Sequence, residues 1–158
     1  MTLPSPLAAS PLLKGFTPVG LRILAEAATG RMVFRGTYAF RAGEPSIGLS
    51  FIVKGTVQIL ARDGGASLAE LAAGDTLGGL SLLSSGGEHL VSAMALSDVE
   101  LLELSRASFE ELGKTRPRTC LKLTLALAGD LADRLREAKG PLREFLVWQI
   151  SKRQSEGR

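Results

Sequence analysis

The sequence predicts an α+β fold in which a core of β-strands lies between helices near both ends of the chain. Residues 31–104 contain about seven or eight short apolar stretches, separated by glycine-containing turns. Apolar residues at helical spacing precede this region, and a longer helical pattern follows it. Strands with this punctuation are typical of a β-sandwich, a jelly roll or a small barrel.

Composition restricts the class of protein. The chain has 158 residues, of which 45% are hydrophobic and 22% charged, as in an ordinary globular domain with a short appendage. A single cysteine and a single histidine exclude an internal disulfide framework, a multi-cysteine zinc site and a two-histidine metal motif. We therefore expect no metal, no cofactor and no catalytic residues.

The first helix is predicted after a proline-rich start. Three prolines stand among small residues in positions 1–11, which predicts a flexible arm there. Thr17 is a suitable N-cap for a helix that begins at Pro18, and Gly30 follows the last helical position.

The N-terminus gives no sign of a targeting segment. It lacks the basic start and apolar stretch of a signal peptide. No apolar run in the chain is long enough for a membrane helix. We expect a cytoplasmic protein with no membrane partner.

Helical spacing resumes near Ser105, which can cap a short helix, as can Ser108. The longest predicted helix follows, over residues 117–139. One apolar stripe along it consists of Leu121, Leu125, Ala128, Ala132 and Leu135. A second stripe consists of Leu123, Leu127 and Leu131. Because so wide an apolar face should contact two surfaces, we expect a homodimer built on the first stripe, the alternative being burial within a larger monomer.

Positive charge is concentrated toward the C-terminus. Residues 1–113 hold 8 Lys and Arg against 11 Asp and Glu, whereas residues 114–158 hold 11 against 5. An acidic protein, an anionic lipid or a nucleic acid would meet that end, although a solvated helix and tail is the simpler interpretation. Residues 140–158 are predicted to form a short amphipathic helix and a basic tail. The residues expected there to contact an unidentified protein partner are Phe145, Trp148, Lys152 and Arg153.

Four segments carry motifs in a recognisable order. Residues 36–44 are similar to a KGxxIFxxGD turn, and residues 51–57 to a strand pair of the form [Y/F]-I-V-x-G-x-V. Residues 71–83 are similar to LxxGDxFGExALL, and residues 101–109 to LLxLxRxxF. Together they resemble the cyclic nucleotide-binding domain of the catabolite-activator type, over residues 12–139. The resemblance implies a β-roll, a jelly-roll-like structure of about eight strands, between an N-terminal helix and a long C-terminal dimerisation helix.

The resemblance also implies a phosphate-binding cassette after Gly74-Asp75, in which a short helix directs backbone N–H groups at a cyclic phosphate. In this family a Glu binds the ribose hydroxyl and an Arg pairs with the phosphate. Gly79 and Val91 occupy these two positions here. The expected ligand-binding residues are Gly78, Gly79, Leu80, Ser81, Leu82, Val91, Ser92 and Ala93.

Both charged contacts of the cassette are therefore missing. Residues 77–96 contain no Lys or Arg, and His89, the one potential cation, is mostly neutral at physiological pH. Losing two charged hydrogen bonds should cost about 3–6 kcal/mol, or about 10²–10⁴-fold in affinity. We expect a degenerate site for which cyclic AMP and cyclic GMP are doubtful partners.

Two functions remain open on this basis. The first is a non-catalytic regulatory or scaffolding module that acts through dimerisation and protein contacts. The second is a small-ligand sensor with an atypical pocket, which would use backbone donors with Ser81 and Ser92, or take haem on His89, another nucleotide or a fatty acid. An enzyme is disfavoured, because no phosphate loop and no carboxylate pair assignable to one cleft is present.

The length of the C-terminal segment bears on DNA binding. Only 18 residues follow Gly140, whereas two helices and their turn need about 25 residues. We therefore expect no helix-turn-helix and no sequence-specific DNA binding. The alternative is a weak, salt-dependent contact of the basic tail with nucleic acid.

Overall fold

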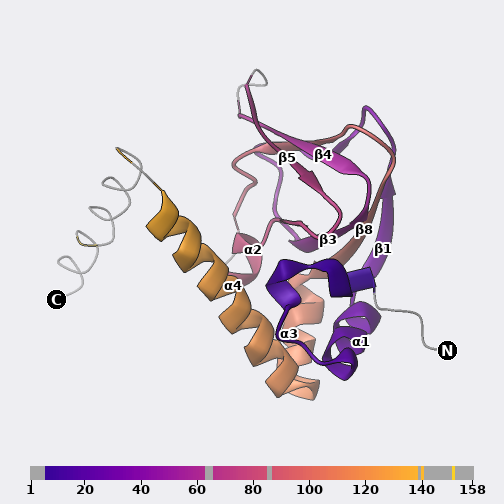
Figure 1. Cartoon of the computed structure of the whole chain (residues 1–158), viewed down its shortest axis with the longest axis vertical. Coiled ribbons are helices and arrows are strands. Elements are labelled where there is room, and N and C mark those ends of the chain that lie inside the picture. The colour runs from indigo at the N-terminus through magenta and orange to yellow at the C-terminus, as the bar shows by residue number, and fades with distance from the viewer. Residues whose placement is uncertain (1–5, 63–65, 85–86, 139, 141–150, 152–158) are drawn as a thin grey trace.

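The described residues of the computed structural model, 6–62, 66–84, 87–138, 140 and 151, contain eight strands in two antiparallel sheets (Figure 1). The first sheet contains, in spatial order, β1 (Thr29–Val33), β8 (Val99–Ser105), β3 (Gly48–Lys54) and β6 (Thr76–Leu77). The second contains β2 (Tyr38–Phe40), β7 (Ser92–Ala95), β4 (Thr56–Leu60) and β5 (Ser67–Ala72). The predicted α+β class and jelly-roll-like β-roll are confirmed.

Helices flank the roll at one end and along one side. The described helices are η1 (Pro6–Ala9), η2 (Pro11–Leu13), α1 (Pro18–Ala27), α2 (Leu80–Leu83), α3 (Arg106–Thr115) and α4 (Pro117–Glu137). Figure 1 shows α1, α3 and the start of α4 together below the roll, while the last turns of α4 project away from it. Two cap predictions are confirmed. The Gly20 N–H donates to Thr17 Oγ1 over 3.1 Å, and the Ser108 N–H donates to Ser105 Oγ over 3.1 Å.

Two apolar cores lie on opposite faces of the first sheet. Side chains alternate along a strand, so a strand covered on both sides supplies both cores. The core inside the roll includes Val33, Ile52, Leu77, Ala93, Val99 and Leu101. The core beneath the helices includes Leu49, Phe51, Leu82, Leu104, Leu123 and Leu127. β3 and β8 contribute to both and therefore fix the helices relative to the roll.

The prediction of a flexible arm is wrong for residues 6–11. This segment forms η1 and the start of η2, and Leu7 is 1% exposed within the core beneath the helices. The prolines fix φ and so favour short 3₁₀ turns, while the leucines between them supply apolar surface for burial. Residues 1–5 lie outside the described part of the chain.

The predictions for the C-terminus fall mostly outside the described residues. Beyond Ala138 only Gly140 and Ser151 are described, which leaves out the predicted amphipathic helix and the basic tail. The predicted docking residues Phe145, Trp148, Lys152 and Arg153 are among those not described. No helix in the described ranges combines the length and the apolar character needed to span a bilayer.

Candidate ligand-binding site

The cassette backbone closes tightly against β3 and α4 through two glycines. Gly78 has φ +76°, and a Cβ atom there would lie 2.7 Å from the Gly48 carbonyl oxygen, so a larger residue is excluded. A Cβ atom at Gly79 would lie 3.2 Å from Leu127 Cδ2 of α4. Thus α4 places a leucine side chain beside the position at which the family resemblance expects a Glu.

Two serines of the predicted site already have partners within the protein. Ser81 Oγ lies 2.9 Å from the Gly48 carbonyl oxygen and 2.8 Å from that of Gly78, so its hydroxyl holds α2 against β3. Ser92 Oγ accepts a hydrogen bond from the Ala42 N–H over 2.9 Å. Both side chains are buried, and their hydroxyls stabilise the roll and the cassette. The structure gives no support to their use as ligand donors.

The other predicted cassette residues are not all in one place. Leu82 belongs to the core beneath the helices and Ala93 to the core inside the roll. Val91 is half-buried. A pocket of about 200 Å³ between the cassette and α4 is lined by Gly78, Gly79 and Leu80, together with Leu127, Asp130, Leu131 and Arg134. Of the predicted ligand-binding residues, Gly78, Gly79 and Leu80 therefore face this pocket.

The C-terminal end of α2 is held by a residue that sequence reasoning did not single out. Arg106 Nη1 donates to the Ser81 carbonyl over 3.1 Å and also to the Ser84 carbonyl. Its Nε donates to Glu110 Oε1 over 3.3 Å. Arg106 is the arginine of the LLxLxRxxF segment, and its place in that motif was the available signal.

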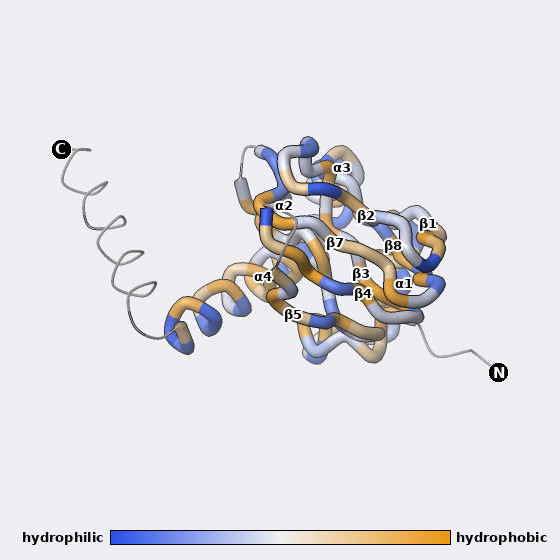
Figure 2. Tube along the Cα trace, turned by 90° about the horizontal axis from the view of Figure 1, so that it is seen from above, coloured by the Kyte–Doolittle hydropathy of each residue, from blue (hydrophilic) through white to orange (hydrophobic). Residues whose placement is uncertain are grey.

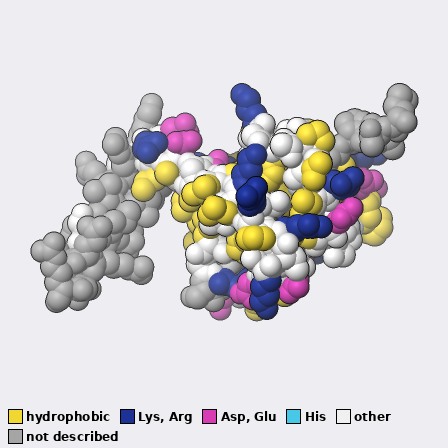
Figure 3. Space-filling model, turned by 90° about the horizontal axis from the view of Figure 1, so that it is seen from below, with side chains coloured by type: hydrophobic (Ala, Val, Ile, Leu, Met, Phe, Trp, Pro, Cys, Tyr) yellow, Lys and Arg dark blue, Asp and Glu magenta, His cyan; other side chains and the backbone are white. Residues whose placement is uncertain are grey.

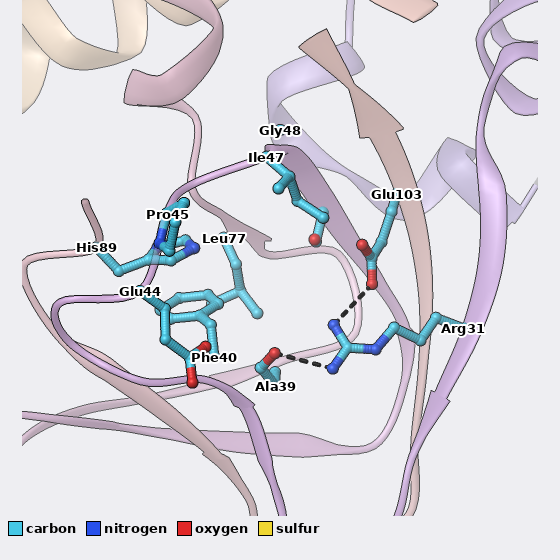
Figure 4. Close-up of a pocket in the computed structure, with 11 residues that line it drawn as sticks. Arg31, Ala39, Phe40, Glu44, Pro45, Ile47, Gly48, Leu77, His89 and Glu103 are labelled. Carbon is cyan, nitrogen blue, oxygen red and sulfur yellow. Dashed lines mark hydrogen bonds and ion pairs between the residues drawn. The ribbon is translucent and has the colours of Figure 1, made fainter. Parts of the chain in front are cut away.

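A second pocket, of about 220 Å³, lies between the two sheets, and we call it the roll pocket (Figure 4). Its charged and aromatic lining residues are Arg31, Phe40, Glu44, His89 and Glu103. Arg31 Nη1 donates to Glu103 Oε1 over 3.0 Å, and its Nη2 donates to the Ala39 carbonyl over 2.9 Å. The guanidinium is therefore already paired.

Strand alternation explains how this ion pair reaches the inside of the roll. Val33 and Leu101 face the core there, so Arg31 and Glu103, each two residues away, face the same way. In the antiparallel register of β1 and β8, Arg31 lies opposite Leu101, which makes Glu103 its diagonal neighbour. Glu103 is 17% exposed, so its carboxylate gains from a nearby cation, while Arg31 is 43% exposed and keeps contact with water.

His89 supplies no positive charge to the roll pocket at neutral pH. Its ring stacks on Phe40 with the ring centroids 3.6 Å apart and the planes 4° from parallel. Burial lowers the pKa of His89 below its usual value, and the nearby Glu44 carboxylate offsets only part of this effect. The described lining thus carries one paired guanidinium and two carboxylates, a poor environment for an anion.

The described part of the chain has few side chains suited to catalysis or to metal binding. No group of three or more His, Cys, Asp or Glu side chains there is arranged to hold a metal ion. Burial raises the pKa of the Cys120 thiol, against a smaller lowering by its hydrogen bond with Thr124, and this keeps the thiol protonated. A protonated thiol is a weak nucleophile.

A β-roll with a cassette helix and a long C-terminal helix defines a ligand-sensing domain of regulatory proteins. The family model described as "Cyclic nucleotide-binding domain" matches residues 31–116, and the chain belongs to that family. The chain is 33% identical over 132 residues to the cyclic AMP receptor protein of Thermus thermophilus, covering 82% of this chain and 59% of that protein. It therefore spans about three-fifths of the length of that relative.

Solved structures give the same fold. The catabolite activator protein of Thermus thermophilus has a TM-score of 0.72 and 31% identity, covering 90% of this chain and 63% of that one. The N-terminal domain of a transcriptional regulator from Streptomyces coelicolor A3(2) has a TM-score of 0.73, covering 85% and 98%. At 24% identity the latter likeness shows the fold alone. These relatives are regulatory proteins by name.

The comparisons contradict two expectations about partners. The expected absence of sequence-specific DNA binding rests on the few residues after Gly140, but the chain is similar to a cyclic AMP receptor protein and a catabolite activator protein. A residue count in a chain that covers 63% of the activator structure does not decide this question. A cyclic nucleotide was expected to be a doubtful partner, whereas the Thermus relative is a cyclic AMP receptor. The site geometry bears on which groups would contact such a ligand.

Proposed function

We propose that the chain is a non-catalytic regulatory module of a cytoplasmic protein that controls transcription, in line with the regulatory names of its relatives. It forms homodimers through α4. Its cassette receives a small ligand without the two charged contacts that the family resemblance expects, so a cyclic nucleotide is held in an atypical and weaker way.

One observation supports the ligand part of this proposal. Residues 77–96 contain no Lys or Arg, and the guanidinium that lines the roll pocket, that of Arg31, is bound to Glu103 and to the Ala39 carbonyl. A cyclic phosphate entering the roll pocket would lose its hydration without gaining an unpaired cation. Arg134, which lines the pocket beside the cassette, is likewise paired, with Asp130 at 2.9 Å. Two missing charged hydrogen bonds correspond to about 3–6 kcal/mol, or about 10²–10⁴-fold in affinity.

Isothermal titration of cyclic AMP and cyclic GMP tests this part. We expect the combined variant Gly79→Glu and Val91→Arg to bind at least one of them about 10²–10⁴-fold more tightly than the natural chain. Val91→Leu is the matched control, because it enlarges the same side chain without adding charge, and it should give no gain. Micromolar binding by the natural chain with no gain in the charged variant would contradict the proposal.

The two faces of α4 support the dimer. At about 100° per residue, Leu121 and Leu125 lie nearly opposite Leu123 and Leu127. Leu123 and Leu127 are 0% and 5% exposed beneath the roll, whereas Leu121 and Leu125 are 59% and 63% exposed. Figure 2 shows hydrophobic positions continuing along α4 where it leaves the body of the protein. An exposed apolar stripe opposite a buried one is the pattern of a helix that packs on a second copy.

Sedimentation analysis tests the dimer. The double variant Leu121→Glu and Leu125→Glu should sediment as a monomer, because each glutamate would have to be buried without a partner in the interface. Leu68→Glu is the control, since Leu68 on β5 is 58% exposed and lies on a different part of the fold. A natural chain that is monomeric at high concentration would refute this part.

The roll pocket favours a second candidate, a sensor of a neutral or cationic small molecule. The carboxylates of Glu44 and Glu103 disfavour an anion and can accept hydrogen bonds from a ligand, and Phe40 and Leu77 give apolar contact. Its volume of about 220 Å³ lies below the roughly 300–1,000 Å³ of usual ligand pockets, which restricts the ligand to a small one. A thermal-shift screen of small amines and neutral nucleosides, repeated on Glu44→Gln, distinguishes this candidate.

A further inference from the structure

Five exposed cations surround the turn between α3 and α4. We call them the basic surface: Lys14, Lys114, Arg116, Arg118 and Lys122. Figure 3 views this end of the protein and shows Lys and Arg side chains gathered across the middle of the face. This surface is separate from the roll pocket, and on α4 its members Arg118 and Lys122 lie within one helical turn of the exposed Leu121.

The members of the basic surface come from three elements that contact one another. Lys114, in the last turn of α3, is followed within four residues by Arg116 and Arg118 at the start of α4. Lys122 stands one helical turn further on. Its Nζ lies 5.1 Å from the centre of the Phe16 ring, which places the end of η2, with Lys14, beside α4.

Some cations outside the basic surface are neutralised within the protein, whereas Arg22, Arg35, Arg41 and Lys54 form no ion pair among the described residues. Arg31, Arg62, Arg106, Arg134 and Arg136 each form an ion pair. Among the residues that the structure describes, no member of the basic surface does so. The first turn of α4 holds no acidic residue, and Arg116 and Arg118 stand at its positive end, where cations are unfavourable. A partner's anions would relieve this repulsion.

We propose that the basic surface is a docking site for an acidic segment of a protein. Arg guanidinium groups pair with carboxylates through two parallel hydrogen bonds, and Arg116 and Arg118 are free to do so. Apolar surface accompanies the charges, because Phe16 is half-buried and Val19, at the start of α1, is 55% exposed. A protein segment offers both carboxylates and aliphatic side chains, whereas a nucleic-acid duplex presents phosphates on its outside and keeps the faces of its bases stacked inside. The mixed character of the surface therefore favours a protein.

Fluorescence anisotropy tests this proposal with two labelled probes, a peptide of alternating Glu and Leu and a duplex DNA of random sequence. The peptide should bind the full chain more tightly than the duplex does, and its affinity should fall as salt is raised. The double variant Arg116→Glu and Arg118→Glu should lose about tenfold or more in peptide affinity. Arg35→Glu with Arg62→Glu makes the same change in net charge away from the basic surface and should leave peptide binding unchanged.

Three results would overturn the proposal: no peptide binding at low salt, an equal loss in the control variant, or tighter binding of the duplex. Misfolding does not confuse the test, because Arg116→Glu and Arg118→Glu place acidic residues at the positive end of α4. A melting temperature at or above that of the natural chain confirms that the variant is folded.

Discussion

The roll pocket and the basic surface differ in whether their cations are paired with acidic groups of the protein. In the roll pocket the Arg31 guanidinium is bound by Glu103 and by a backbone carbonyl. At the α3–α4 turn, Arg116 and Arg118 form no ion pair among the described residues. An anion entering the pocket finds its cation occupied, whereas an anion reaching the turn finds free ones. The difference means that an anion would meet unpaired cations at the α3–α4 turn and a paired one in the roll pocket.

Removing Glu103, the ion-pair partner of Arg31, should have the largest effect on stability. Glu103→Ala should lower the free energy of unfolding by about 1–1.5 kcal/mol, because it removes the ion pair of a guanidinium that lines the roll pocket but is 43% exposed and therefore partly screened by water. Glu88→Ala is the control, because Glu88 Oε2 lies 3.9 Å from Arg62 Nη2 and both side chains are 61% exposed. This substitution should lower the free energy of unfolding by less than about 0.5 kcal/mol. Urea unfolding measures both.

Glu103→Ala also tests whether the ion pair keeps anions out of the roll pocket. With Glu103 absent, Arg31 loses its acidic partner and keeps the Ala39 carbonyl, so inorganic phosphate should raise the melting temperature of Glu103→Ala more than that of the natural chain. Equal responses of the two proteins to phosphate would show that pairing with Glu103 is not what keeps anions out of the pocket.

Replacing a cation at the turn should have a smaller effect of opposite sign. Arg118→Glu should raise the free energy of unfolding by about 0.5–1 kcal/mol, because a carboxylate in the first turn of α4 interacts favourably with the helix dipole. Arg118→Gln, which removes the charge without reversing it, should give about half of this gain. A loss of stability in both variants would mean that Arg118 has an intramolecular partner in solution.

The smallest expected effect concerns pH. The pKa of His89 is lower in the folded protein than in the unfolded chain, so the unfolded chain binds the proton more readily. The stabilising contribution is therefore complete above the unfolded value of about 6.5 and is lost as pH falls toward the folded value. Thermal melts across this range should show His89→Phe, which keeps a ring against Phe40, losing less stability than the natural chain. An identical pH dependence would contradict the assignment.

Local chemistry made the helices predictable from sequence. Thr17 and Ser105 cap helices because a hydroxyl reaches an N–H three residues on, which needs no knowledge of the rest of the fold. The start of α4 followed from Pro117, and its two faces from apolar spacing. The glycine-punctuated strands were equally visible, although the choice of a β-roll over a sandwich or barrel required the family resemblance.

The roll pocket could not be predicted from the sequence, because it depends on contacts between residues that are far apart in the chain. Arg31 and Glu103 are 72 residues apart, and only the register of β1 with β8 makes them neighbours. The roles of Ser81 and Ser92 were also out of reach, because their partners lie on β3 and after β2. The proline-rich start suggested flexibility, since composition alone does not reveal that Leu7 finds a place in the core.

The most direct test compares two ligands that differ in charge. Adenosine and cyclic AMP share a base and a sugar, but only cyclic AMP carries the phosphate anion. If no free cation serves the cavity, titration calorimetry of the natural chain should show cyclic AMP binding no more tightly than adenosine, because the phosphate loses water without gaining a charged partner. A preference of tenfold or more for cyclic AMP, about 1.4 kcal/mol, would contradict the account.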